Sequence, residues 1–100
     1  MRAQGLRFEW DSKKSGANVR KHGVSFHEAS TLFSDPNEVM LSDPDHSQDE
    51  ERFISIGQSS TGQLMLACYT ETEDVVRLIS VRLATGTERR TYESGSEEDA

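Results

Sequence analysis

The sequence predicts an α+β domain in which a small antiparallel β-sheet is combined with two N-terminal helices and a short C-terminal helix. Three observations support this fold class. Helix-capping residues occur twice in the first third of the chain, short strand-like runs separated by tight turns fill the middle, and another capping signal lies near the end. Successive short strands joined by tight turns are typical of an antiparallel meander. The expected order is β-α-α-β-β-β-β-α, in one domain over residues 1–93.

The first elements follow from local chemistry. Residues 6–10 alternate in part and carry Phe and Trp, which favours a short strand. Asp11 stands where an N-cap belongs, so we expect a helix over residues 12–22 that ends at Gly23.

A second helix is predicted after Ser25, because Ser25 and Glu28 have the spacing of a capping box and Val24 with Ala29 fits a hydrophobic staple. The apolar residues that follow fall on one helical face: Phe26, Ala29, Leu32 and Phe33. Asp35-Pro36 should end this helix.

The rest of the chain reads mainly as strands. They are expected over residues 38–42, 52–58, 63–70 and 75–82. Residues 43–51 read as an acidic loop, and Thr85 with Glu88 forms a T-x-x-E capping box that opens a helix through about Tyr92. Residues 94–100 read as an acidic, disordered tail.

Composition excludes several classes of protein. The 100 residues include 33% hydrophobic residues, enough for a modest core, and lack the roughly 18-residue apolar run that a membrane-spanning helix needs. The first residues do not resemble a signal peptide. The single cysteine, Cys68, excludes an intramolecular disulfide and reads as a buried small hydrophobe. We therefore expect a cytoplasmic protein with no membrane partner.

Charge is unevenly distributed. The net charge is −7, from 11 Lys+Arg and 18 Asp+Glu, and the acid is concentrated in residues 43–51 and 93–100. Basic residues are concentrated in residues 12–22 and again at Arg82, Arg89 and Arg90. Such clusters are most often solvated helix faces, but a local basic surface can bind phosphates on an acidic protein.

Common catalytic and metal-binding motifs are absent. The sequence has no P-loop, dinucleotide-binding, zinc-protease or nucleophile-elbow motif. Its histidines, His22, His27 and His46, are scattered. His46 lies in an acidic Asp43–His46 stretch whose carboxylates and imidazole are possible ligands of a divalent metal, but a solvated turn is the preferred interpretation. No metal and no cofactor are expected.

The remaining polar residues suit metal-free RNA cleavage. This reaction needs a base for the 2′-hydroxyl, cations for the developing phosphorane charge and an acid for the 5′-oxygen. Histidine, lysine, arginine and tyrosine supply these groups. Ordinary structural roles are the alternative. His22 can interact favourably with the dipole at the C-terminal end of its helix, and Arg89 and Arg90 can be ordinary exposed helix residues.

An ordered series of residues resembles the BrnT family of ribonuclease toxins from bacterial type II toxin–antitoxin systems. The likeness begins with Phe8-Glu9-Trp10-Asp11, Asn18 and Arg20–Phe26, and continues through Glu28-Ala29, Phe33, Asp35-Pro36, Asp43–Ser47, Glu51–Phe53, Ile56-Gly57 and Tyr69-Thr70. It closes with Arg77, Ile79-Ser80, Arg82, Ala84-Thr85, Glu88-Arg89 and Tyr92. Ser12, Ser15 and Gly16 depart from the usual pattern, and the glycine should weaken its helix by roughly 1 kcal/mol.

The resemblance implies a RelE-like fold, metal-independent RNA cleavage that arrests translation, and a cognate ribbon-helix-helix antitoxin. It also implies that the toxin–antitoxin complex represses its own operon, so that the toxin meets operator DNA only through the antitoxin. The candidate catalytic residues are His22 as general base or acid, Lys21 and Arg82 as charge stabilisers, and Tyr92 as a stacking or donor group. The candidate RNA-binding residues are Lys14, Asn18, Arg89 and Arg90.

A second hypothesis comes from a different class. The chain could be a non-catalytic module that holds a DNA-binding partner on an apolar sheet face and acts as its corepressor. The basic clusters favour the ribonuclease, whereas the overall charge of −7 favours the binding module.

Overall fold

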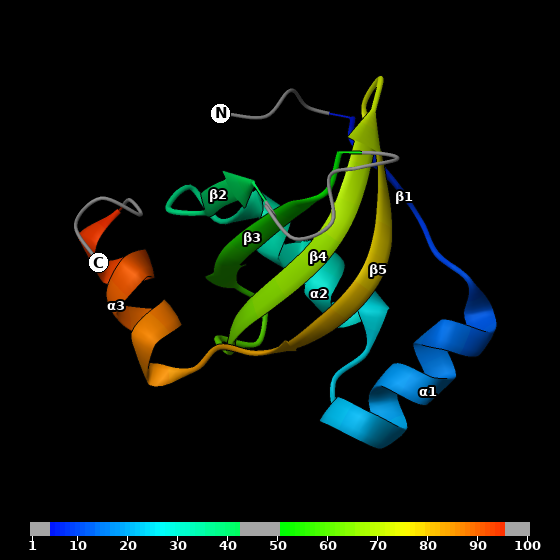
Figure 1. The fold of residues 1–100 in the computed structure, drawn as a ribbon, viewed down its shortest axis with the longest axis horizontal. Coiled ribbons are helices and arrows are strands. Elements are labelled where there is room, and N and C mark those ends of the chain that lie inside the picture. Colours follow the sequence, from blue (N-terminus) through cyan, green and yellow to red (C-terminus); the bar gives the residue numbers. More distant parts are fainter. Residues whose placement is uncertain (1–4, 43–50, 96–100) are drawn as a thin grey trace.

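The computed structural model describes residues 5–42 and 51–95. Its N-terminal part contains β1 (Arg7–Glu9), α1 (Ser12–His22), α2 (Phe26–Ser30) and a 3₁₀ helix, η1 (Thr31–Ser34). There follow β2 (Val39–Ser42), β3 (Phe53–Gln58), β4 (Leu64–Thr72), β5 (Val75–Leu83) and α3 (Gly86–Ser94). The predicted order of elements and the α+β class are confirmed, except that the predicted second helix divides into α2 and η1 (Figure 1).

The sheet is mixed, so the prediction of a purely antiparallel sheet was wrong. Its strand order is β1-β5-β4-β3-β2. The strands β2 to β5 form the expected antiparallel meander, but β1 pairs parallel to β5, with Arg7 opposite Val75 and Glu9 opposite Arg77. The physical reason is that side-chain alternation reports which face of a strand is buried and carries no information about strand direction. The RelE-like label stays a prediction.

Apolar residues on one face of the sheet pack against α2 and η1. Phe26, Ala29 and Leu32 are fully buried there, against sheet residues that include Met65 and Tyr69. The rings of Phe33 and Tyr69 pack edge to face with their centroids 5.0 Å apart. Burial of each large side chain contributes roughly 1.5–3 kcal/mol, so this cluster is the principal core.

The opposite face carries a second, smaller cluster beneath α3. Ile56, Leu64 and Leu66 are buried there, and Tyr92 of α3 packs against them. Helices therefore cover parts of both faces of the sheet. Cys68 also lies on this face and is half-buried, which corrects the expectation that it is a buried small hydrophobe.

The predicted caps form with one modification. Asp11 and Ser25 cap α1 and α2, and Thr85 with Glu88 forms a complete capping box at α3. At α2 the Ser25 oxygen accepts from the Glu28 N–H, but the Glu28 carboxylate bonds to Ser59 and Thr61 in the β3–β4 turn. The capping box expected at Ser25 is thus only half formed, because Glu28 ties α2 to the sheet.

The C-terminal helix is longer than expected. It extends through Ser94 and ends at Gly95, whose φ of 86° is the left-handed conformation that glycine adopts easily. Ser94 is therefore helical and not part of a tail. The predicted disorder of residues 96–100 and the predicted solvated turn at Asp43–His46 both fall on residues outside those that the structure describes. None of the helices in residues 5–42 and 51–95 has the length and apolar character needed to cross a membrane.

Candidate active site

Lys21 and His22 lie in the last turn of α1, which ends where Gly23 adopts a φ of 76° and donates to Val19 O at 2.8 Å. Lys21 is exposed and His22 is half-buried. Within the described part of the chain, neither side chain forms a hydrogen bond or an ion pair. Both side chains are therefore available to a ligand, and the carbonyl end of the helix favours cationic groups there.

Asn18 fixes the position of this helix end. Its side chain is buried, and its Nδ2 donates to Val81 O and to Val24 O, both at 2.9 Å. Its Oδ1 accepts from the Val81 N–H at 3.1 Å. The amide thus acts like a short neighbouring strand on the edge of β5. The structure gives Asn18 a structural role in place of the predicted contact with RNA, because its amide is committed to the backbone.

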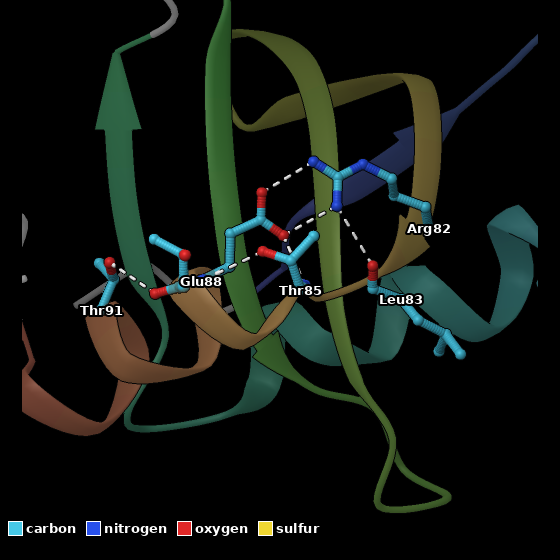
Figure 2. A network of polar contacts seen from close by, with 6 residues as sticks. Arg82, Leu83, Thr85, Glu88 and Thr91 are labelled. Carbon is cyan, nitrogen blue, oxygen red and sulfur yellow. Dashed lines mark hydrogen bonds and ion pairs between the residues drawn. The ribbon is translucent and has the colours of Figure 1, made fainter.

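Arg82 follows Val81 directly and forms a bidentate ion pair with Glu88 of α3 (Figure 2). The two nitrogen–oxygen distances are 2.8 and 2.7 Å, and Nη1 also donates to Leu83 O at 3.2 Å. Hydrogen bonds from Arg82 lower the pKa of Glu88 and outweigh its partial burial, while Glu88 raises the pKa of Arg82. The charge of Arg82 is therefore partly compensated before any phosphate arrives.

The contact between Arg82 and Glu88 leaves part of the guanidinium group free. Glu88 and Leu83 take both Nη1 hydrogens and one Nη2 hydrogen. The Nε–H and the second Nη2–H have no partner among the described residues, and 38% of the Arg82 side chain is exposed. These two hydrogens form one edge of the planar fork, which suits bidentate recognition of a phosphate.

Tyr92 is held by Asp35. Its hydroxyl donates to Asp35 Oδ2 at 2.6 Å, and the same oxygen accepts from the Gln58 N–H at 2.8 Å. Burial, followed by the hydrogen bond to Asp35, raises the pKa of Tyr92 to about 12. A cavity of about 480 Å³ beside Tyr92 is lined partly by Glu38 and Glu93, which does not suit an anionic substrate. Tyr92 therefore anchors α3, and its hydroxyl is not free to serve as a donor.

The other predicted RNA-binding residues are exposed but dispersed. Lys14 lies in the first turn of α1, whereas Arg89 and Arg90 lie on α3. Figure 1 shows α1 and α3 on opposite sides of the sheet. Arg90 donates to Thr87 Oγ1 at 3.2 Å within its own helix. The structure therefore attaches the helix that carries Lys21 and His22 to Val81, the residue before Arg82, but it does not gather all the predicted residues into one cleft.

Two acidic residues of this region were absent from the predicted site. Glu88 acts on Arg82 and Asp35 acts on Tyr92. The capping-box spacing signalled Glu88, although only its helix-capping role was predicted. No sequence signal linked Asp35 with a residue 57 positions away. Within residues 5–42 and 51–95, no group of three or more His, Cys, Asp or Glu side chains is placed to hold a metal ion.

Comparison with known proteins places the chain in a family. The family model described as "Ribonuclease toxin, BrnT, of type II toxin-antitoxin system" matches residues 10–88. The crystal structure of the Brucella abortus ribonuclease toxin BrnT matches with a TM-score of 0.59 and 20% sequence identity, covering 81% of this chain and 99% of that one. At that identity the likeness supports the fold alone. The search of curated proteins found no match. Because the family model spans most of the chain, the protein belongs to the BrnT family of type II ribonuclease toxins.

Proposed function

We propose that this chain is the toxin of a type II pair and acts as a metal-independent endoribonuclease in the cytoplasm, arresting translation by cleaving RNA. The observation that carries the proposal is the position of Lys21 and His22. Among the residues that the structure describes, neither has a side-chain partner, and both lie at the end of a helix that Asn18 attaches to β5, one residue before Arg82. A chain of the BrnT family therefore presents an imidazole and two cationic groups near one edge of its sheet.

These groups suit cleavage by the neighbouring 2′-hydroxyl of RNA. The 2′-oxygen bonds to phosphorus while its proton passes to a base, and the bond from phosphorus to the 5′-oxygen breaks as an acid protonates that oxygen. The products are a 2′,3′-cyclic phosphate and a 5′-hydroxyl. We assign His22 to one of the two proton transfers. Lys21 and the free edge of Arg82 stabilise the negative charge that develops on the phosphorane.

Residues outside this group take supporting roles. Lys14, Arg89 and Arg90 are exposed cations that contact phosphates away from the scissile bond. Tyr92 is a positioning residue. Its hydrogen bond to Asp35 holds α3 in place, and α3 carries Glu88, whose ion pair orients Arg82.

The partner in this proposal is a ribbon-helix-helix antitoxin. Family membership implies a protein antitoxin. In this proposal the complex binds operator DNA through the antitoxin and represses its own operon.

The decisive test is cleavage of ribosome-free RNA in the presence of EDTA. The wild type should cleave, and His22→Ala should lower the rate by about 10²–10⁴-fold. His27→Ala is the matched control, because His27 is an exposed histidine on α2 outside the proposed site. Arg82→Lys, which keeps the charge but loses the planar fork, should also lower the rate.

Other outcomes separate the alternatives. Equal loss in the two histidine variants would remove His22 from the mechanism. If the wild type cleaves RNA only in a translating extract, the enzyme depends on the ribosome. If it cleaves in neither setting yet binds its antitoxin, it is the non-catalytic corepressor module.

A further inference from the structure

Part of the sheet face that carries α3 is left open along β5. Tyr92 packs α3 against residues of β3 and β4 that include Ile56 and Leu66. Across the pairing register, Leu66 lies opposite Arg82 and Cys68 lies opposite Ser80. Ser80 is nevertheless exposed and Arg82 is half-exposed. The helix therefore covers the β3 side of this face and leaves the β5 side accessible.

Three arginines share this open face. Arg77 lies opposite Glu9 of β1, and Arg7 lies opposite Val75, so the parallel pairing of β1 with β5 adds Arg7 to the row. Phe8 and Val76, the intervening pair, belong to the core on the other face, which confirms the side on which the arginines lie. We call Arg7, Arg77 and Arg82 the β5 arginine row.

The donors of this row are available to an anion. Arg77 makes a single hydrogen bond to Glu9 at 3.3 Å, and both side chains are about half exposed, so this ion pair contributes little to stability. Arg7 has no side-chain partner among the described residues. Arg82 retains the free edge described above. Arg82 lies five positions after Arg77 along the strand, a separation of roughly 16 Å between the two backbone positions that is too long for a single phosphate to bridge.

We propose that the β5 arginine row binds the sugar–phosphate backbone of the RNA substrate and leads it from the candidate active site at Arg82 along β5 to β1. This inference rests on the proposed ribonuclease function and adds the path of the substrate. Arg82 contacts the phosphate at or next to the cleaved bond. Arg77 and Arg7 contact phosphates further along the same RNA strand. These phosphates are remote from the cleaved bond, so the two arginines bind the ground state and the transition state of the reaction equally.

The row makes a kinetic prediction that differs from the prediction for His22. Loss of a remote phosphate contact removes uniform binding, so it raises KM and leaves kcat unchanged. Such a loss also makes binding less sensitive to salt. For single-stranded RNA, the slope of the logarithm of the binding constant against the logarithm of the salt concentration should become shallower by about 0.7.

The test uses the full chain and a fluorescent RNA oligonucleotide whose 2′-hydroxyls are methylated, so that it binds without being cleaved. Arg77→Gln should weaken binding about tenfold and reduce the salt slope. Arg20→Gln is the matched control, because it removes one exposed positive charge from α1, outside the row. It should change the affinity less than about twofold.

A second variant separates RNA binding from structural damage. Glu9→Gln breaks the same ion pair as Arg77→Gln but keeps the arginine. The proposal expects Glu9→Gln to bind RNA as tightly as the wild type or more tightly. If Glu9→Gln weakens binding as much as Arg77→Gln does, the ion pair is structural and the row is not a phosphate site.

Cys68 provides a readout that does not depend on affinity. It is the single cysteine of the chain and shares the open face with Ser80. Bound RNA should slow its modification by N-ethylmaleimide, and Arg77→Gln should remove that protection at the same RNA concentration. Wild-type cleavage with neither protection of Cys68 nor an effect of Arg77→Gln would overturn this path while leaving the ribonuclease intact. Absence of both binding and cleavage in the wild type would overturn both proposals.

Discussion

The side-chain amide of Asn18 forms hydrogen bonds with both the N–H and the C=O of Val81, as a neighbouring strand would. Beyond the short β1, this part of the β5 edge would otherwise present unpaired backbone groups. One side chain therefore satisfies the edge and sets the position of α1. The position of Lys21 and His22 relative to β5 depends on this contact.

Replacing Asn18 by Ala should lower the free energy of unfolding by about 2–4 kcal/mol, because three hydrogen bonds are lost and the buried groups of Val81 are left without partners. Urea unfolding measures the change. Arg20→Ala, an exposed position on the same helix, should change the free energy by less than about 0.5 kcal/mol. A small effect of Asn18→Ala would show that packing alone holds α1 on the sheet.

Tyr92→Phe should cost about 1.5–3 kcal/mol of stability, because the hydroxyl donates to a charged carboxylate. Cleavage by the folded variant should stay within a few-fold of the wild type if Tyr92 only positions α3. A loss of 10²-fold or more with unchanged KM would instead make Tyr92 the proton donor. A double-mutant cycle with Asp35→Asn isolates the energy of the pair.

The two glycines Gly16 and Gly57 should respond to alanine in opposite ways. A Cβ at Gly16 in α1 would lie 3.5 Å from the flexible Arg20 Nη1, so Gly16→Ala should stabilise the protein by roughly 0.5–1 kcal/mol. A Cβ at Gly57 would lie 3.1 Å from the backbone oxygen of Leu32, so Gly57→Ala should destabilise it by roughly 1–3 kcal/mol. Thermal unfolding of the two variants measures both changes. Stabilisation by Gly57→Ala would contradict the prediction, because it would show that η1 can move away from the new methyl group without a loss of stability.

Stability should fall in acid because of two carboxylates. Hydrogen bonds from Arg82 lower the pKa of Glu88, and those from Gln58, Tyr92 and Asn37 outweigh burial to lower the pKa of Asp35. A lowered pKa in the folded state adds stability that is present above the ordinary values of about 4 and is lost as the pH falls through the folded values.

The measurement is urea unfolding between pH 7 and pH 3. Glu88→Gln should lower stability at pH 7 and flatten its decline in acid, since the linked proton is no longer taken up. Glu93→Gln removes a carboxylate from an exposed position on the same helix, and should leave the slope as in the wild type. An unchanged slope in Glu88→Gln would assign the acid sensitivity to other groups.

Local chemistry predicted most of the fold. The caps at Asp11 and Thr85 fix the starts of α1 and α3, and Gly23 fixes the end of α1, through contacts within a few residues. The end of α3 at Gly95 was not predicted, since the helix was expected to end at about Tyr92. The direction of β1 and the break between α2 and η1 depend on distant packing. Arg7 pairs with Val75, and Glu28 bonds to the β3–β4 turn, so no local pattern reports either feature.

The candidate site was predictable in part. The basic turn at Lys21 and His22 and the arginine at the end of β5 follow from charge and element boundaries. The burial of Asn18 was missed because an amide at that helical position reads as exposed until β5 is placed beside it. Arg77 was missed as a site residue because residues five positions apart in a regular strand lie on opposite faces. A bulge in β5, where the register shifts between Cys68 and Tyr69, places Arg77 and Arg82 on the same face.

The contact between Asn18 and Val81 also sets an order of assembly, because it joins residues 63 positions apart. Contacts of such long separation form only after the later segment has been synthesised, and domains take shape as the chain emerges. Lys21 and His22 are made early but reach their place at the β5 edge only when β5 is available to receive α1. The candidate active site is therefore completed only after β5 has been made, so a chain interrupted before β5 carries His22 without the strand that positions it.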